Sequence, residues 1–199
     1  MKTDFGIAFH ATMSHEGQYS NDPRDRGGET WMGIARKINP FWSGWPIIDQ
    51  IKSNANQKDW SMAMNADDEL FEHVKSFYKA FYWDALNLDN VIYQEIADEL
   101  FDTAVNQGTG TAGRYLQEAL NLLNSGQKHY KNIEPDGKIG NGTLTALKSY
   151  FDIPGRSEER SLKTIIKVLN GLQFCKYKDI CKIDEGQEAF LFGWMNRVG

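Results

Sequence analysis

Apolar residues with helical spacing run through the middle of this chain and limit it to a fold built from helices. Leu70, Val74, Phe77 and Phe81 recur at steps of three and four, which places them on one side of a helix. The same spacing continues in two further segments, so long helices are predicted at 67–81, 92–105 and 111–123. Shorter helices are predicted at 4–14, 143–151, 161–177 and 185–198. No clear alternating strand pair accompanies them, so we expect an all-α, or mainly α, protein.

Composition places the chain among ordinary globular proteins and excludes two classes of partner. Its 199 residues are 41% hydrophobic and 25% charged, enough for one large domain or two small ones. The net charge is −5 and no basic stripe is visible, so no nucleic-acid partner is expected. No apolar run approaches the roughly 18–20 residues that span a bilayer, so no membrane insertion is expected either.

The two cysteines, Cys175 and Cys181, are too few for a disulfide framework. With four scattered histidines they do not match a zinc pattern, so we expect unreactive thiols and no metal. The N-terminus, M-K-T-D-F-G-I-A-F-H, lacks the apolar core of a secretory signal. We therefore expect synthesis in the cytoplasm without a signal peptide.

A charged segment near the N-terminus has the opposite character to the helices. From Glu16 to Ile34 it reads E-G-Q-Y-S-N-D-P-R-D-R-G-G-E-T-W-M-G-I, with six charged residues among glycines and a proline. Such a segment cannot build a core, so it is either a solvated loop or an active site. Asn, Asp and Gly form good surface turns, which supports the first interpretation.

The spacing of its side chains also suits acid–base chemistry. Glu16 ends the first predicted helix, where partial enclosure would raise its pKa and keep it protonated as a general acid. Asp25 and Thr30 follow nine and fourteen positions later, and Gly27-Gly28 lets the chain turn back. A water between Glu16 and these groups is the arrangement that glycoside hydrolysis needs. Alternatively, Thr30 simply caps a helix that runs to Lys37.

The segment resembles a known signature. It is similar to E-G-G-Y-x-N-D-P-x-D-x-G-G-x-T-x-x-G-I of glycoside hydrolase family 108, which are N-acetylmuramidases, including phage endolysins and proteins once labelled secretion activators. It also resembles the E-x8-D-x5-T arrangement of phage-type lysozymes, with one residue fewer before Thr30. Gln18 and Arg26 depart from the family pattern, which usually has Gly at the first position and a small residue or Pro at the second.

This resemblance implies a lysozyme-like fold and assigns roles to residues. Glu16 would be the catalytic acid, while Asp25 and Thr30 would position water or stabilise charge. Asp22 would bind the substrate or replace Asp25 in that second role. Tyr19 would line the sugar cleft.

The C-terminal half resembles the predicted peptidoglycan-binding region of the same family. The resemblance rests on F-D-T-A-V-N-Q-G at 101–108 and D-G-K-I-G-N-G-T-L at 136–144, and it continues to the end of the chain. Asn106 and Gln107 would reach the sugar cleft, or else cap a helix end. The D-G-x-x-G-x-x-T pattern is either a binding motif or a loop-to-helix entry capped by Thr143.

We expect a catalytic region at 1–90 and a peptidoglycan-binding region at 91–199. No Pro/Ser-rich linker separates them, so their helices are expected to share one core. The expected activity is cleavage of the β-1,4 bond between N-acetylmuramic acid and N-acetylglucosamine, with no metal or organic cofactor. Its partners would be peptidoglycan glycan strands at the cell wall or periplasm, with a holin-like partner for export. The alternatives are a lytic transglycosylase and a non-catalytic wall-binding or secretion-accessory protein.

Overall fold

The computed structural model describes residues 2–13, 19–21 and 27–198. Its contacts divide the chain into two compact units. One, the sheet unit, is Phe9–Phe81; the other, the helical unit, joins Met1–Ala8 to Tyr82–Gly199. Helix α1 (Phe5–Met13) contributes to both, because the division falls between Ala8 and Phe9.

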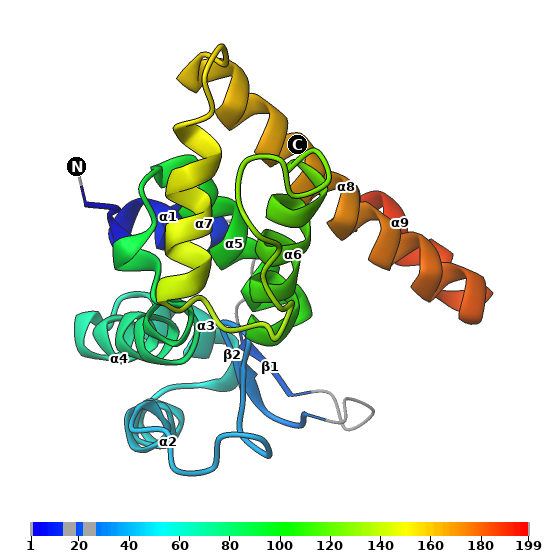
Figure 1. Cartoon of the computed structure of the whole chain (residues 1–199). Coiled ribbons are helices and arrows are strands. Elements are labelled where there is room, and N and C mark those ends of the chain that lie inside the picture. The colour runs from blue at the N-terminus through cyan, green and yellow to red at the C-terminus, as the bar shows by residue number, and fades with distance from the viewer. Residues whose placement is uncertain (1, 14–18, 22–26, 199) are drawn as a thin grey trace. The chain divides into compact units, whose positions relative to one another are not determined.

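The sheet unit contains the strands of the described chain (Figure 1). They form an antiparallel sheet in the order β1 (Tyr19–Ser20), β2 (Thr30–Trp31) and β3 (Ile34–Ala35). The sequence showed no alternating pattern because each strand has only two residues, which is too short for an alternation to be visible. The expectation of a mainly α fold is nevertheless confirmed, since the remaining elements are helical.

The predicted helical turn at Thr30 is wrong. Thr30 and Trp31 pair with Ala35 and Ile34 in a hairpin whose two turn residues, Met32 and Gly33, have φ of 44° and 80°. Positive φ at both turn positions matches the right-handed twist of the paired strands and cannot continue a helix. The Thr30 hydroxyl donates to the Gly28 carbonyl oxygen at 3.1 Å rather than capping a helix.

Three helices complete the sheet unit: α2 (Gly44–Asn54), α3 (Trp60–Asn65) and α4 (Asp68–Tyr78). A short 3-10 turn, η1 (Gln57–Asp59), precedes α3, and Asp67 caps α4 by accepting from the Leu70 amide. The sequence did not predict α2 or α3. Near the start of α2, Trp42 packs so closely on Gly44 that a Cβ at Gly44 would lie 2.3 Å from the Trp42 ring.

Aromatic residues dominate the core of the sheet unit. Trp31 and Trp45 are almost completely buried, and Phe9 makes edge contacts with Phe71 and Tyr78. The stripe on α4 is buried at Leu70, Val74 and Phe77, as predicted. Phe81 is 60% exposed, because the chain changes at Lys79 to a π-helix, η2 (Lys79–Trp83), whose wider turn rotates the stripe outward.

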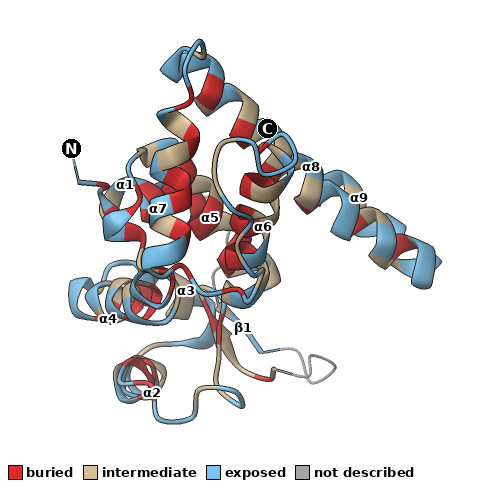
Figure 2. Cartoon of the chain, in the orientation of Figure 1, coloured by how far each residue is buried: buried red, intermediate tan, exposed pale blue. Residues whose placement is uncertain are grey.

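The helical unit is built around α5 (Gln94–Gln107), α6 (Thr109–Leu122), α7 (Asn141–Phe151) and α8 (Glu158–Ile183). Two 3-10 turns, η3 (Asp84–Leu86) and η4 (Leu88–Asn90), lead into it. Helix α5 packs against both α6 and α8. In Figure 2 the buried residues of α8 form a stripe, Ser161, Ile165, Leu169, Gln173, Tyr177 and Cys181, with four-residue spacing.

The D-G-K-I-G-N-G segment is a loop held against α6 by one buried side chain. The Gln117 amide nitrogen donates to Asp136 Oδ1 at 2.8 Å and to the Lys138 carbonyl at 3.0 Å, and its oxygen accepts from the Gly137 amide at 2.8 Å. The predicted cap at Thr143 is wrong. Helix α7 begins at Asn141, and Thr143 is buried within it with its hydroxyl donating to the Lys138 carbonyl at 3.3 Å.

The chain ends in a 3-10 turn, η5 (Glu185–Gln187), and a short apolar helix, α9 (Glu188–Met195). Helix α9 lies along the C-terminal half of α8 (Figure 1), where Trp194 stacks on Tyr177 with ring centroids 4.9 Å apart. Within the described residues, no helix is long and apolar enough to cross a membrane.

Candidate functional site

Three of the residues expected to carry the chemistry, Glu16, Asp22 and Asp25, lie outside the described residues. The structure describes both flanks of this segment. Helix α1 ends at Met13 before it, Tyr19–Ser20 forms β1 inside it, and residues 27–31 lead into and form β2 after it. The candidate site is therefore built here from the sheet and from the side chains that hold it.

Glu29 is the centre of a charged cluster beside the sheet. Its Oε1 accepts from the Lys52 ammonium at 2.6 Å and from the Tyr19 hydroxyl at 2.8 Å. Its Oε2 accepts from Arg36 Nη1 at 2.6 Å. The backbone adds a fourth tie, because the Arg36 amide donates to the Glu29 carbonyl at 2.8 Å. The side chain is only 10% exposed, and both of its carboxylate oxygens accept hydrogen bonds.

The partners decide the charge of Glu29. Burial alone would raise its pKa, but the hydrogen bonds from Lys52, Arg36 and Tyr19 outweigh burial and lower the pKa below its usual value. Burial and the hydrogen bond to Glu29 together raise the pKa of the Tyr19 hydroxyl, which stays protonated as a donor. Glu29 is thus an anion at neutral pH and cannot serve as a general acid.

Aromatic rings enclose the cations of this cluster. The Lys52 ammonium lies 5.1 Å from the Trp60 ring centroid and 5.8 Å from that of Tyr19. Tyr19 and Trp60 themselves meet edge to face at 5.8 Å. The Arg36 guanidinium carbon lies 4.9 Å from the Trp45 ring centroid. The same guanidinium also donates a hydrogen bond to the Asp49 carboxylate. Helix α2 supplies Asp49 and Lys52, so it fixes the cluster to the rest of the sheet unit.

The structure brings Tyr19 and Thr30 together on neighbouring strands, where Ser20 pairs with Thr30 and Tyr19 with Trp31. Sequence analysis missed Lys52, Arg36 and Trp60 as partners of this segment. Lys52 lies 23 positions from Glu29, and nothing in the sequence links the two. The one available signal was Glu29 itself, a charged residue two positions before the buried Trp31.

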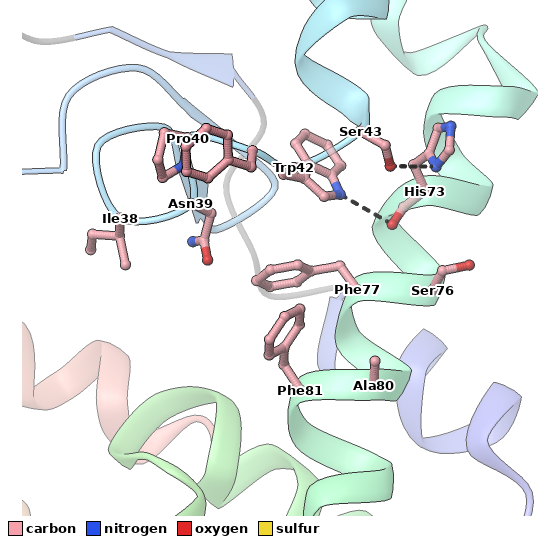
Figure 3. A pocket seen from close by; sticks show the side chains of 11 residues that line it. Ile38, Asn39, Pro40, Trp42, Ser43, His73, Ser76, Phe77, Ala80 and Phe81 are labelled. Atoms are coloured by element: carbon pink, nitrogen blue, oxygen red, sulfur yellow. Dashed lines mark hydrogen bonds between the residues drawn. The ribbon is translucent and has the colours of Figure 1, made fainter.

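A groove of about 490 Å³ opens elsewhere in the sheet unit (Figure 3). One wall is the 38–43 connection between β3 and α2, and the other is formed by α4 and η2. Phe41, at the rim of the groove, is 98% exposed. On the opposite wall the ring centroids of Phe77 and Phe81 are 4.7 Å apart. Exposed ring faces of this kind suit the apolar face of a sugar.

Polar atoms tie the two walls of the groove together. The Trp42 indole donates to the His73 carbonyl at 3.3 Å, and the Ser43 hydroxyl lies 2.9 Å from His73 Nδ1 (Figure 3). These contacts join the 38–43 connection to α4, so the groove is a preformed feature of the sheet unit.

Asn106 and Gln107 belong to the helical unit, at the end of α5. The Asn106 amide donates back to Asp102, at 2.8 Å to its carbonyl and 3.2 Å to its carboxylate. Gln107 accepts from the Tyr115 hydroxyl at 2.9 Å and donates to the Gln173 carbonyl at 3.5 Å. Both residues line a pocket with Tyr177 and Trp194.

Comparison with known proteins assigns the family. The family model described as Glycosyl hydrolase 108 matches residues 9–108. The chain belongs to the glycosyl hydrolase 108 family. A second model, described as a Predicted Peptidoglycan domain, matches residues 111–199, so the two models cover almost all of this family member. No curated protein matches the chain.

Among solved structures, this glycosyl hydrolase 108 member is similar to one titled "Structure of Brucella abortus SagA". The two chains are 21% identical, with a TM-score of 0.56 over 98% of this chain and 88% of that one. At this identity the likeness concerns the fold. Family and likeness together confirm the mainly α, lysozyme-like fold. A glycosyl hydrolase match beside a peptidoglycan match indicates a glycosidase that acts on peptidoglycan.

Proposed function

We propose that this protein is an N-acetylmuramidase that cleaves the β-1,4 bond between N-acetylmuramic acid and N-acetylglucosamine, with Glu16 as the general acid. The observation that carries the proposal is the family match over 9–108, which includes the whole charged segment. The charge state of Glu29 supports the choice of acid. Glu29 is held as an anion by Lys52 and Arg36, so this neighbouring glutamate is not available to donate a proton.

In the proposed reaction Glu16 protonates the oxygen that leaves the muramic acid carbon. Asp25 and Thr30 hold the attacking water or stabilise the positive charge that develops on the sugar. Thr30 is suited to this role, because its hydroxyl donates to the Gly28 carbonyl and leaves the hydroxyl oxygen as an acceptor for water. Asp22 is the second candidate for the same role, or binds the sugar.

The Glu29 cluster would act as the anchor of the catalytic segment rather than as a reacting group. The Tyr19 hydroxyl and Glu29 join positions on either side of residues 20–28, and Lys52 ties both to α2. Catalytic groups gain rate when their positions are held before the substrate binds. Tyr19 would line the cleft with its ring while its hydroxyl is engaged.

The wider assignment follows from the same proposal. Region 1–90 would be catalytic, and region 91–199 would bind peptidoglycan. The enzyme would act on glycan strands at the cell wall or periplasm. Asn106 and Gln107 would contact the substrate from the second region. A holin-like pore would be the partner for export.

The decisive experiment is digestion of purified peptidoglycan, followed by mass spectrometry of the soluble products. Wild type, Glu16→Gln and Glu69→Gln are compared; Glu69 is a matched control, because its side chain is 79% exposed on α4. Reducing muramic acid ends should appear with wild type and Glu69→Gln and disappear with Glu16→Gln. Thermal unfolding of the three proteins checks that each is folded.

Two other outcomes would replace the proposal. Anhydro-muramic acid ends would identify a lytic transglycosylase, which uses an acid but no activated water. Intact peptidoglycan that still retains the wild-type protein on sedimented sacculi would identify a non-catalytic wall-binding protein.

A further inference from the structure

The helical unit contains a pocket whose lining differs from that of the aromatic groove in the sheet unit. It has a volume of about 280 Å³, enough for one sugar ring or the end of a short peptide. Three helices form it, α5 at its C-terminal end, α8 and α9. Its lining residues are Asn106, Gln107, Lys176, Tyr177, Ile180 and Trp194.

The charge of this lining favours an anion. Lys176 is the charged residue of the lining, which contains no carboxylate. Its ammonium makes no ion pair or hydrogen bond with the residues that the structure describes, whereas Lys178 on the same helix lies 3.9 Å from Asp179. The neighbouring Asp102 is paired with Arg197 at 3.2 Å. An incoming carboxylate would therefore meet a cation that has no ion-pair partner among the described residues.

The two amides of the lining fit a peptide group. The Asn106 nitrogen is directed back to Asp102, which leaves the side-chain oxygen as an acceptor for an N–H group. In Gln107 the oxygen already accepts from Tyr115, so the nitrogen is the atom that can donate to a carbonyl. Its contact with the Gln173 carbonyl is long, at 3.5 Å. One acceptor and one donor at adjacent residues match the N–H and C=O of a single amide.

Stacked aromatic rings form the back of the pocket. Tyr177 is 4% exposed and stacks on Trp194, which in turn stacks on Phe190 at 6.2 Å. Burial raises the pKa of the Tyr177 hydroxyl, which keeps its proton. The Gln107 side chain faces this hydroxyl and lowers the pKa by less than burial raises it. One turn away on the same face of α8, the side-chain amide of Gln173 is completely buried and has no hydrogen-bond partner among the described residues.

From this combination we propose that the pocket binds a short peptide ending in a carboxylate, as in the peptide stem that muramic acid carries in peptidoglycan. Lys176 would receive the carboxylate, and Asn106 with Gln107 would receive an amide group. The choice of a wall peptide rests on the proposed function, while the preference for a carboxylate rests on the pocket alone. The helical unit would then recognise the peptides of the wall, and the sheet unit its sugars.

The test uses the full chain carrying Glu16→Gln, so that no probe is cleaved. Three probes are titrated by calorimetry and by NMR of the labelled protein: N-acetylmuramyl-L-alanyl-D-isoglutamine, the same dipeptide with an N-acetyl group in place of the sugar, and an N-acetylglucosamine trimer without a carboxylate. The two peptide probes should bind and shift the amides of Asn106, Gln107 and Lys176 and the indole of Trp194. The trimer should not shift them.

Two substitutions on one helix give the matched comparison. Lys176→Gln removes the ammonium and should weaken peptide binding by about tenfold, the size of one charge-assisted contact. Lys182→Gln removes another exposed lysine of α8, outside the pocket lining, and should leave the affinity unchanged. Equal effects of both substitutions, equal binding of the trimer, or no shifts at millimolar peptide would overturn the proposal.

Digestion of peptidoglycan by the chain with Glu16 intact separates this proposal from the proposed function. Reducing muramic acid ends without peptide binding would remove the pocket assignment and leave the muramidase. Peptide binding that depends on Lys176, without any digestion, would keep the pocket and remove the muramidase.

Discussion

Tyr19 donates a 2.8 Å hydrogen bond to Glu29, ten residues further along the chain. In the sequence the two residues stand on either side of residues 20–28, so this bond links the chain before that stretch to the chain after it. Lys52 and Arg36 neutralise the same carboxylate from α2 and from the end of β3. Glu29 is therefore an ion-paired residue that the structure describes, whereas Glu16 and Asp25 are the residues proposed to react.

Glu29→Gln should destabilise the sheet unit and slow digestion. The change keeps the shape of the side chain but leaves Lys52 and Arg36 without their shared anion. We expect a loss of about 2 kcal/mol in the free energy of unfolding. Under the proposed function, digestion of peptidoglycan should slow by about tenfold, because Glu29 is proposed to hold the reacting residues in position. Urea unfolding and product release from labelled peptidoglycan measure the two effects.

Asp49→Asn is the control for Glu29→Gln, because Asp49 shares Arg36 but its side chain is 52% exposed. It should cost less than about 1 kcal/mol. The pKa of Glu29 is lowered in the folded state, so its stabilisation is present above its unfolded pKa and is lost as pH falls through the folded pKa. Equal losses in both variants would contradict an anchoring role for Glu29.

The β2–β3 turn offers a stabilising substitution. Met32 has a φ of 44°, which costs a residue with a Cβ more than it costs Asn. Met32→Asn should raise the free energy of unfolding by about 0.5–1 kcal/mol, since Asn-Gly is the preferred pair in this turn. Its carbonyl still accepts from the Tyr78 hydroxyl. Gly33→Ala, at φ 80°, should instead lower the free energy of unfolding by about 1–2 kcal/mol. Thermal unfolding by circular dichroism compares them.

Gly113→Ala should destabilise the helical unit although Ala is the better helix former. A Cβ at Gly113 would lie 2.1 Å from the Gly137 carbonyl oxygen, so α6 and the 136–142 loop would have to separate. We expect a loss of about 3 kcal/mol. Gly171→Ala, on α8 with open space around its Cβ, should gain about 0.5–1 kcal/mol. Hydrogen exchange of the α6 amides reports the difference, and similar protection in both variants would rule out the close packing.

Glu99 on α5 should give the helical unit a pH dependence opposite to that of Glu29. Burial, then the charge of Asp102, raise the pKa of Glu99 to about 7. Since the folded state favours the protonated acid, stability is highest below the unfolded pKa and falls as pH rises toward 7. The Asn170 amide, turned so that its nitrogen faces the carboxylate at 3.0 Å, supports the anion and limits the loss.

Glu99→Gln should therefore raise the free energy of unfolding at pH 8 by about 1–2 kcal/mol and have little effect at pH 4. Urea unfolding at both values measures the change. A gain of the same size at pH 4 would show that packing, not charge, is responsible.

The helical elements were predictable because their signal is local. Leu70, Val74 and Phe77 mark α4 by spacing alone, and all three are buried. The apolar spacing gave a wrong prediction at two places, where the local backbone conformation departs from that of an α-helix. The π-helix from Lys79 turned Phe81 outward, and the positive φ of Met32 made a hairpin where a helix cap at Thr30 was expected. In both cases the backbone conformation sets the direction of the residues that follow, and the pattern of apolar residues does not predict that conformation.

By itself, the sequence determined that this chain is mainly helical, and its charged signature pointed to the family that the comparisons then established. Both depend on residues close together in the chain. The fold was needed to show that Glu29 is an ion-paired anion and that Lys176 lines a pocket with Asn106 and Gln107. Charge state and pocket composition depend on neighbours in space. Lys52 lies 23 positions from Glu29, and Gln173 on α8 lies 66 positions from Gln107.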